Sequence, residues 1–299
     1  MSSETRALIA GAIDLHVHSF PDLMPRSIND LSMAALVRDA GMRGFVLKSH
    51  YAPTADRAWL AQQVVPEVDV FGAVVLNHFV GGMNPLAVEA LARAGGRLVY
   101  LPTSDAMNEA DVLDTWEADR PLPPYLQIKA QLVERGRLPP PIPMVDQSGS
   151  VTRQCREVLE VVAEHDLVLA TGHVAPHETL AVLAAAHALG ISRLLVTHPE
   201  SPHIGATIEQ QREMVGYGAV LERCYAYLVD DASQRAAFEA VRATGVDNNV
   251  LSSDLGMVAR EDPVTGLGDF AQKELLAGFS EAEIRQMICQ GPARLLDVG

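Results

Sequence analysis

Short apolar runs recur along this chain, separated by segments in which apolar residues return with helical spacing. Each run has the length of a buried parallel strand and lacks the strict alternation of a strand that faces water on one side. The runs predict eight strands, at residues 12–18, 44–50, 70–77, 97–102, 167–173, 193–198, 218–224 and 249–254.

Between the predicted strands lie amphipathic stretches that predict helices. A glycine follows four of them, where a helix commonly ends in the left-handed conformation: Gly41, Gly95, Gly190 and Gly245. Ser280, followed by acidic residues, has the pattern of the N-cap of a last helix. The clearest stretches are 31–40, 85–94, 153–165, 177–189, 208–217 and 233–244.

The order of these elements predicts one domain over residues 1–299 with the (β/α)8 architecture of a TIM barrel. A doubly wound parallel sheet is the alternative. The barrel is favoured because polar residues end many of the strands, and in a barrel all those ends meet at one mouth. The sequence has neither a GxGxxG motif nor a P-loop motif, so nothing in it indicates a dinucleotide or a bound nucleoside triphosphate.

One long segment interrupts the regular order of strands and helices. Residues 103–150 follow the fourth predicted strand and contain two proline-rich runs, 121–124 and 139–143, which exclude regular helix through those runs. Loops of this length are commonly functional or disordered. On a barrel this insertion would lie at the mouth, so we expect a lid or a substrate wall. A surface excursion or an oligomer contact is the alternative.

The composition limits which kinds of molecule this protein is expected to bind. A formal net charge of −15 argues against a nucleic-acid partner. The three cysteines lie far apart and form no CxxC motif, which is typical of the reducing cytoplasm rather than of a disulfide scaffold. We expect neither a signal peptide nor a membrane span. The expected partner is a small-molecule substrate in the cytoplasm, with a homo-oligomer left open.

Histidines and one aspartate mark the ends of several predicted strands. His16 and His18 form a His-x-His pair, and alternate residues of a strand point the same way, so both side chains can enter one space. His173, His198 and Asp254 end the fifth, sixth and eighth strands. Imidazoles and a carboxylate can bind a transition metal, and Asp254 can also accept a proton. Taken singly, each histidine could be a structural side chain whose hydrogen bonds are all made within the protein. The aspartate alone could be the N-cap of a turn.

These motifs resemble those of the amidohydrolase superfamily of metal-dependent hydrolases, whose branches include phosphotriesterase-like lactonases and TatD-like nucleases. The matching segments are 13–18, 171–173, 197–199 and 253–254, and segment 291–296 is similar to the superfamily's closing segment. They span nearly the whole chain in the expected order. The resemblance implies a (β/α)8 barrel with one or two divalent metal ions, bound by His16, His18, His173, His198 and Asp254.

The fourth strand departs from the superfamily's pattern. Binuclear members often bridge their metals with a carboxylated lysine or a glutamate from that strand, whereas residues 98–103 contain neither. The second strand instead ends with Lys48, and a lysine buried there is costly as a bare cation. We predict Lys48 as a bridging ligand in carboxylated form; an ammonium that pairs with substrate or an aspartate is the alternative. His50 shares its face and is a candidate ligand or hydrogen-bond donor to substrate.

Three further residues are candidates for substrate contact. His78 follows the third strand, Arg223 lies on the seventh, and His203 lies on the loop after the sixth. An arginine there can bind a carboxylate or a phosphate, and a plain salt bridge with Glu222 or Asp254 is the alternative.

The predicted function is hydrolysis of an amide, cyclic amide, lactone or ester bond by metal-activated hydroxide, with Asp254 carrying the proton to the leaving group. Zinc suits a histidine-rich site best, and manganese, nickel and iron are the alternatives. Two other interpretations stay open. One is a mononuclear metal-dependent decarboxylase or hydratase on the same barrel, and the other is a non-catalytic metal-binding protein.

Overall fold

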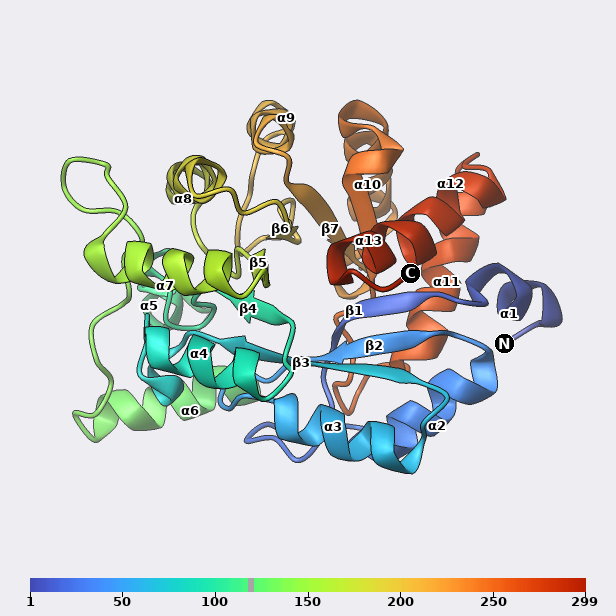
Figure 1. Cartoon of the computed structure of the whole chain (residues 1–299), viewed down its shortest axis with the longest axis horizontal. Helices are drawn as coiled ribbons and strands as arrows, with labels where there is room; N and C mark the ends of the chain where they lie inside the picture. Colours follow the sequence, from blue (N-terminus) through green and yellow to red (C-terminus); the bar gives the residue numbers. More distant parts are fainter. Residues whose placement is uncertain (118–120) are drawn as a thin grey trace.

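Eight parallel strands follow one another around a barrel in this computed structural model, which describes residues 1–117 and 121–299 (Figure 1). Each strand pairs with the next one along the chain, an order that excludes the doubly wound alternative and confirms the predicted (β/α)8 fold. All eight predicted strands are present: β1 (Ile13–Val17), β2 (Gly44–Leu47), β3 (Asp69–Val75), β4 (Leu98–Tyr100), β5 (Val168–Ala170), β6 (Leu194–Thr197), β7 (Val220–Cys224) and β8 (Asn249–Ser252).

The first strand and the segment after the last strand close the barrel. Val17 forms a parallel bridge with Leu255, and the His18 amide donates a hydrogen bond of 2.9 Å to the Leu255 carbonyl. The Asp254 amide donates one of 2.9 Å to the His16 carbonyl. Closure therefore joins the two segments that carry His16, His18 and Asp254.

Two layers of apolar side chains explain the composition of the strands. Inward-pointing residues such as Val46, Tyr100 and Leu195 fill the barrel interior. Outward-pointing neighbours such as Phe45 and Leu194 pack against the helices. A strand buried on both faces needs an unbroken apolar run, which is the pattern found in the sequence.

The helices form an outer layer around the strands (Figure 1). All six predicted stretches are helical, with ends within two residues of those predicted, and Gly41 ends its helix in the left-handed conformation with φ 75°. Within the described ranges no helix combines the length and apolar character that a membrane crossing needs. The outer helices are α1 (Ser3–Ile9), α2 (Asp30–Ala40), α3 (Ala55–Val64), α4 (Pro85–Arg93), α7 (Arg153–Glu164), α8 (Pro176–Ala188), α9 (Ile208–Gly216), α10 (Asp231–Thr244), α11 (Pro263–Leu276), α12 (Glu281–Arg285) and α13 (Gly291–Leu296).

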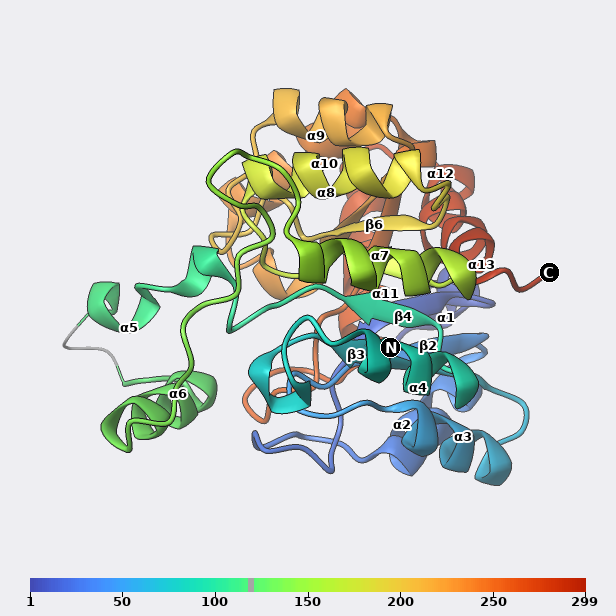
Figure 2. The same ribbon diagram turned by 60° about the vertical axis from the view of Figure 1, so that its left-hand side comes forward.

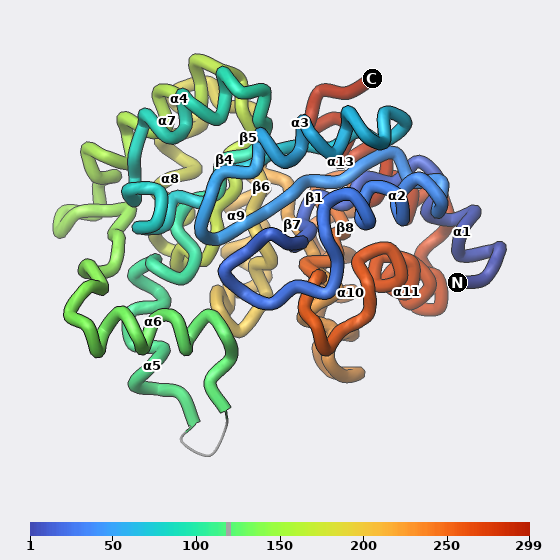
Figure 3. The backbone as a smooth tube through the Cα atoms, turned by 90° about the horizontal axis from the view of Figure 1, so that it is seen from below, coloured from blue at the N-terminus to red at the C-terminus, as the bar shows by residue number. Residues whose placement is uncertain are grey.

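The insertion after β4 extends from one side of the barrel (Figures 2 and 3). It contains the 3-10 helix η2 (Met107–Glu109) and the helices α5 (Val112–Thr115) and α6 (Pro124–Glu134), while residues 118–120 lie outside the described part. The expectation that the first proline run excludes helix was wrong at its last residue. Pro124 opens α6, at a position where a missing N–H costs no helical hydrogen bond. Run 139–143 has no helix, as predicted.

Candidate metal centre

A bulge in β1 brings His16 and His18 to the inner face of the barrel. Between the pairing positions of Asp14 and Val17, β1 has one more residue than β2. A bulge of this kind redirects the side chains beside it. Both histidines are buried and their ring centres lie 5.4 Å apart, as the His-x-His spacing predicted.

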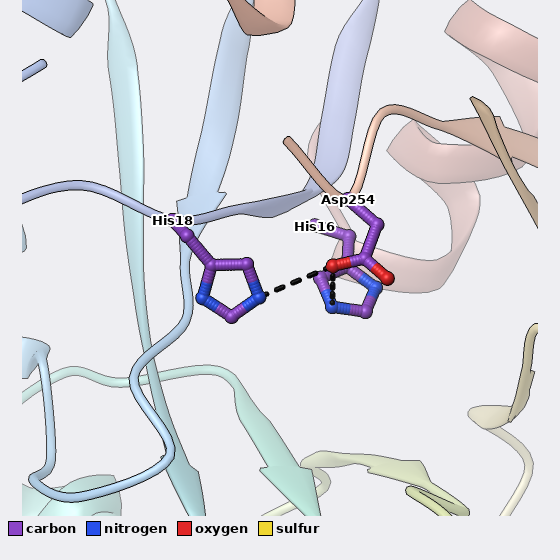
Figure 4. Close-up of side chains that lie close together, drawn as sticks. All are labelled: His16, His18 and Asp254. Atoms are coloured by element: carbon purple, nitrogen blue, oxygen red, sulfur yellow. Dashed lines mark hydrogen bonds and ion pairs between the residues drawn. The ribbon is translucent and has the colours of Figure 1, made fainter. Parts of the chain in front are cut away.

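Three donor atoms converge at the barrel mouth (Figure 4). Nε2 of His16 lies 3.0 Å, and Nε2 of His18 lies 3.2 Å, from Oδ1 of Asp254. Asp254 has a positive φ of 50°, a conformation that residues other than glycine rarely adopt and that clusters at functional sites. The three side chains have the geometry of a group that can hold one metal ion.

Acceptors hold the opposite nitrogen of each imidazole. Nδ1 of His16 lies 3.2 Å from Oε2 of Glu222, and Nδ1 of His18 lies 3.0 Å from the carbonyl oxygen of Lys48. An acceptor at Nδ1 places the proton there and turns the Nε2 lone pair toward Asp254. This is how metal-ligating histidines are usually oriented.

The electrostatics of the three residues fit a cation between them. Two nitrogen lone pairs and a carboxylate oxygen repel one another unless a positive charge or a proton lies among them. Burial lowers the pKa of His18 well below its usual range, so a proton fits poorly there. Burial also opposes charge on His16, yet the carboxylates of Asp254 and Glu222 raise its pKa overall. Neutral imidazole and carboxylate together are a donor set for divalent transition metals.

Lys48 directly follows β2 and lies next to His16. Its Nζ lies 2.9 Å from Nε2 of His16 and 4.4 Å from the centre of the Tyr100 ring. Burial lowers the pKa of Lys48, although nearby carboxylates oppose that shift. The neutral amine is the form that adds CO2. The position therefore suits the expected carboxylated lysine, and it suits equally an amine hydrogen-bonded to His16.

His173 and His198 lie across the mouth from β1. Their ring centres are 5.1 Å apart, and the ring of His198 lies 6.1 Å from that of His16. Nδ1 of His198 contacts the Ser201 hydroxyl at 2.9 Å, whereas its Nε2 is buried without a hydrogen-bond partner among the described residues. His198 also has a positive φ, of 27°. A buried, unpaired imidazole nitrogen that faces other histidines fits the role of a metal ligand.

The insertion supplies a carboxylate that sequence reasoning missed. Oε1 of Glu109 lies 3.0 Å from Nδ1 of His173 and 2.6 Å from Nδ1 of His203. Burial opposes the charge of Glu109, but the hydrogen bonds from the two histidines lower its pKa to about 2. These three residues form a second group able to hold a metal ion. No motif marks Glu109, because its partners are 64 and 94 residues away in the sequence.

Two glycines let the strand ends approach one another. Gly172, just after β5, has φ 60°, and a Cβ there would collide with the Leu101 carbonyl. Gly256 has φ 129°, and a Cβ there would collide with the His18 carbonyl. Glycine at both positions allows the backbone to bring the candidate ligands together.

A cavity of about 230 Å³ opens beside these histidines. Its wall includes His50, His203 and the insertion residues Ser104 and Tyr125. Nδ1 of His50 lies 2.8 Å from the hydroxyl oxygen of Thr103, and burial lowers the pKa of His50 well below its usual range. Two of the expected substrate contacts therefore face the cavity, and the insertion forms part of its wall.

His78 is placed differently from the expectation. Its Nε2 lies 2.8 Å from the carbonyl oxygen of Pro140, and its backbone amide donates to Asp105 at 2.7 Å. Among the described residues it is not part of the cavity wall. His78 therefore connects β3 to the insertion.

Arg223 points outward, because it alternates with Glu222 on β7. Its guanidinium donates to Glu200 at 2.5 Å and to Asn249 at 2.8 Å, away from the cavity. This placement argues against the expected substrate contact, and the salt-bridge partner is Glu200 rather than Glu222 or Asp254. The same alternation turns Glu222 inward to His16, a role that strand periodicity would have revealed.

Solved structures of other proteins share this fold over almost their whole length. An amidohydrolase from Pseudomonas aeruginosa matches with a TM-score of 0.64 at 10% identity, covering 99% of this chain and 98% of that one. The organophosphorus hydrolase from Deinococcus radiodurans matches with a TM-score of 0.57 at 14% identity, covering 98% of this chain and 93% of that one. A 2,6-dihydroxybenzoate decarboxylase matches with a TM-score of 0.56 at 13% identity, covering 97% of this chain and 100% of that one. At these identities the likeness establishes the fold, and it confirms the barrel expected from the resemblance to amidohydrolases.

Comparisons of the sequence itself give a narrower result. A comparison of the sequence with curated proteins finds no match. One family model matches residues 11–222, a segment that contains β1 to β6 and most of β7, together with His16, His18, Lys48, His173 and His198. Because this match covers well over half of the chain, the protein belongs to the family of unknown function DUF6282.

Proposed function

We propose that this protein is a metal-dependent hydrolase that cleaves an amide, cyclic amide, lactone or ester bond of a small molecule. One observation carries the proposal: Nε2 of His16 and Nε2 of His18 both face Oδ1 of Asp254, while Glu222 and the Lys48 carbonyl hold the opposite nitrogens. This donor set has the composition and orientation of a transition-metal site. The amidohydrolase and the organophosphorus hydrolase with the same fold support the reaction class.

His16, His18 and Asp254 would hold a first ion, and His173 and His198 a second. Lys48, after addition of CO2 to its neutral amine and loss of a proton, would offer a negative charge and two oxygens between the two ions. Zinc suits these ligands best, with manganese, nickel and iron as alternatives. When bound, such ions supply a nucleophilic water at neutral pH and polarise the scissile carbonyl.

The chain's own groups perform the remaining tasks. Asp254 contacts both histidines through Oδ1, and Oδ2 has no hydrogen-bond partner among the described residues. It accepts the proton of the attacking water and passes it to the leaving group. Burial opposes its charge, but His16 and His18 hold its pKa well below the usual range, which keeps it an acceptor at neutral pH. Glu222 fixes the orientation of His16, and the insertion contributes Ser104 and Tyr125 to the cavity wall.

The test combines metal content with turnover. The purified protein should hold close to two divalent ions per chain, and a chelator should remove these ions together with activity on a panel of simple esters, lactones, amides and cyclic amides. Adding back each metal in turn identifies the ion that restores the rate. Full turnover by exhaustively demetallated protein would rule out the proposed reaction.

A mononuclear decarboxylase or hydratase is the second candidate. The compact trio of His16, His18 and Asp254 is by itself sufficient for one ion, and a decarboxylase shares the fold. A single ion per chain, with release of CO2 or loss of water from substrate, would favour this candidate. Stoichiometric metal without turnover of any kind would indicate a metal-binding protein.

A further inference from the structure

A buried arginine that no motif marked faces the cavity. The side chain of Arg26 is 1% exposed and forms part of the cavity wall. Nε and Nη2 each lie 2.9 Å from the same oxygen of Asp22, whose side chain is fully buried. Nη1 makes no hydrogen bond within the described part of the chain. One edge of the guanidinium is thus anchored, and donors on another edge remain available to a ligand.

The loop that carries Arg26 is fixed on both sides. Arg26 forms a backbone bridge with Met257 after β8, and the Ser27 amide donates to the Gly256 carbonyl at 2.9 Å. A second bridge joins Phe20 to residue 29 across the base of the loop. The arginine is therefore held in position before any ligand arrives, which lowers the entropy lost on binding.

Arg26 lies directly beside the candidate metal ligands. Its Nη2 is 3.3 Å from Nδ1 of His18, and Nε2 of the same ring is 3.2 Å from Asp254. Among the described side chains that line the cavity, Arg26 alone has a guanidinium and Asp254 is the one aspartate, while Lys48 adds no positive charge when it is carboxylated. A buried guanidinium with unused donors is a local binding partner for an anion, even in a chain with net charge −15. An anionic group bound by Arg26 must lie close to the reacting bond, because Arg26 contacts His18, which is itself one of the three candidate metal ligands.

The remaining walls are aromatic and apolar. Tyr51, Tyr125 and Tyr227 contribute rings, and Met24 and Met257 contribute flexible thioethers. The volume of about 230 Å³ is below the roughly 300–1,000 Å³ typical of drug-sized ligands. The walls therefore suit a small, flat and largely apolar body.

We infer that the cavity binds a small carboxylic acid with a ring, whose carboxylate pairs with Arg26 while the ring lies among the tyrosines and methionines. Planar guanidinium and carboxylate groups match in a bidentate pair, and a buried pair of this kind discriminates strongly against neutral analogues. The inference rests on the proposed function for the reaction that follows, but ligand binding itself needs no turnover.

Binding of benzoate, with benzamide as its neutral analogue of the same shape, tests the inference by calorimetry on the metal-loaded protein. The wild type should prefer benzoate by at least tenfold. Arg26→Met should abolish that preference, and Arg26→Lys should keep part of it. Arg43→Met is the matched control, because Arg43 pairs with Asp69 at the opposite end of the barrel and its loss changes the net charge equally.

The outcomes separate the possible binding modes. Circular dichroism and metal content of each variant establish that the fold and the trio are intact. Equal affinity of the wild type for benzoate and benzamide overturns the inference. A benzoate preference that survives Arg26→Met but disappears when metal is removed also overturns it, since the ions would then bind the carboxylate. Failure of the proposed function looks different: benzoate still binds through Arg26, but no metal-dependent turnover is found.

Discussion

The two sides of the barrel mouth hold their histidines in different ways. On the β1–β8 side, the Nδ1 atoms of His16 and His18 are held by Glu222 on β7 and by the carbonyl of Lys48 directly after β2. On the β5–β6 side, the ring nitrogens of His173 and His203 are held by Glu109 from the insertion. The first side is built by the barrel alone, and the second is built by the barrel together with the insertion.

This difference teaches which part of the site can change. Strand ends in a closed barrel are fixed by hydrogen bonds to neighbours on both sides, so the β1–β8 ligands keep their geometry whatever covers the mouth. The position of Glu109 depends instead on how the insertion is anchored. A change in the insertion should therefore alter the second ligand group and the choice of substrate before it disturbs the first.

The largest effect is expected from removing a ligand on the side built by the barrel. His18→Asn should eliminate bound metal and reduce turnover by about a thousandfold or more, because a shorter amide at this position cannot replace the imidazole. Elemental analysis and steady-state kinetics measure both quantities. His165→Asn is the matched control, since His165 pairs with Glu89 on the outer helices. Retention of both ions in His18→Asn would contradict the assignment of the trio.

Lys48→Met should have the next largest effect. Loss of the bridge should lower metal occupancy and reduce the rate by about a hundredfold, and short carboxylates added to the buffer should restore part of the activity by filling the vacant position. Mass spectrometry of the native protein would detect the added CO2. Lys273→Met, on α11, is the control for loss of a lysine.

A different result for Lys48→Met would favour the alternative. If the variant keeps its metals and only its KM rises, Lys48 contacts substrate as an ammonium. The two sides of the mouth would then lack a shared ligand, and the mononuclear interpretation would gain support.

Glu109→Gln tests the side that depends on the insertion. The neutral amide weakens the hold on His173 and His203, so affinity for the second ion should fall by about tenfold while the first ion stays bound. Metal titration of the demetallated protein resolves the two affinities. Glu134→Gln, an exposed position in the same insertion, should change neither. Loss of the first ion in Glu109→Gln would show that the two sides are not independent.

The strands and the first group of ligands could be predicted because their signals are local. Each strand is buried on both faces and reads as an apolar run, and His16 and His18 are two residues apart on one strand. Asp254 was recognisable because it ends the last run. The roles of Glu222 and Arg223 were missed, although strand alternation alone would have placed them on opposite faces.

Glu109 and Arg26 could not be predicted in the same way. Arg26 lies in a loop and Glu109 ends the three-residue 3-10 helix η2, and neither segment has a periodicity that tells which way a side chain points. Their roles appear only when the chain brings distant segments together, as when Arg26 meets Met257 and Glu109 meets His203. Helix α6 was not predicted, and of its residues only Pro124 belonged to the run expected to exclude helix.

The smallest effect is expected from loosening the insertion at its anchor. Lys129, 7% exposed on α6, donates from Nζ to the carbonyls of Ser104 at 3.1 Å and Glu109 at 2.6 Å. Hydrogen bonds to charged groups are worth about 1.5–3 kcal/mol each, so Lys129→Met should raise the frequency with which the insertion opens. Hydrogen exchange should become faster in η2 and α6 and stay unchanged in β1 and β8, with Lys273→Met as control. Faster exchange in β1 and β8 as well would mean that the insertion stabilises the whole mouth, and the contrast between the two sides would fail.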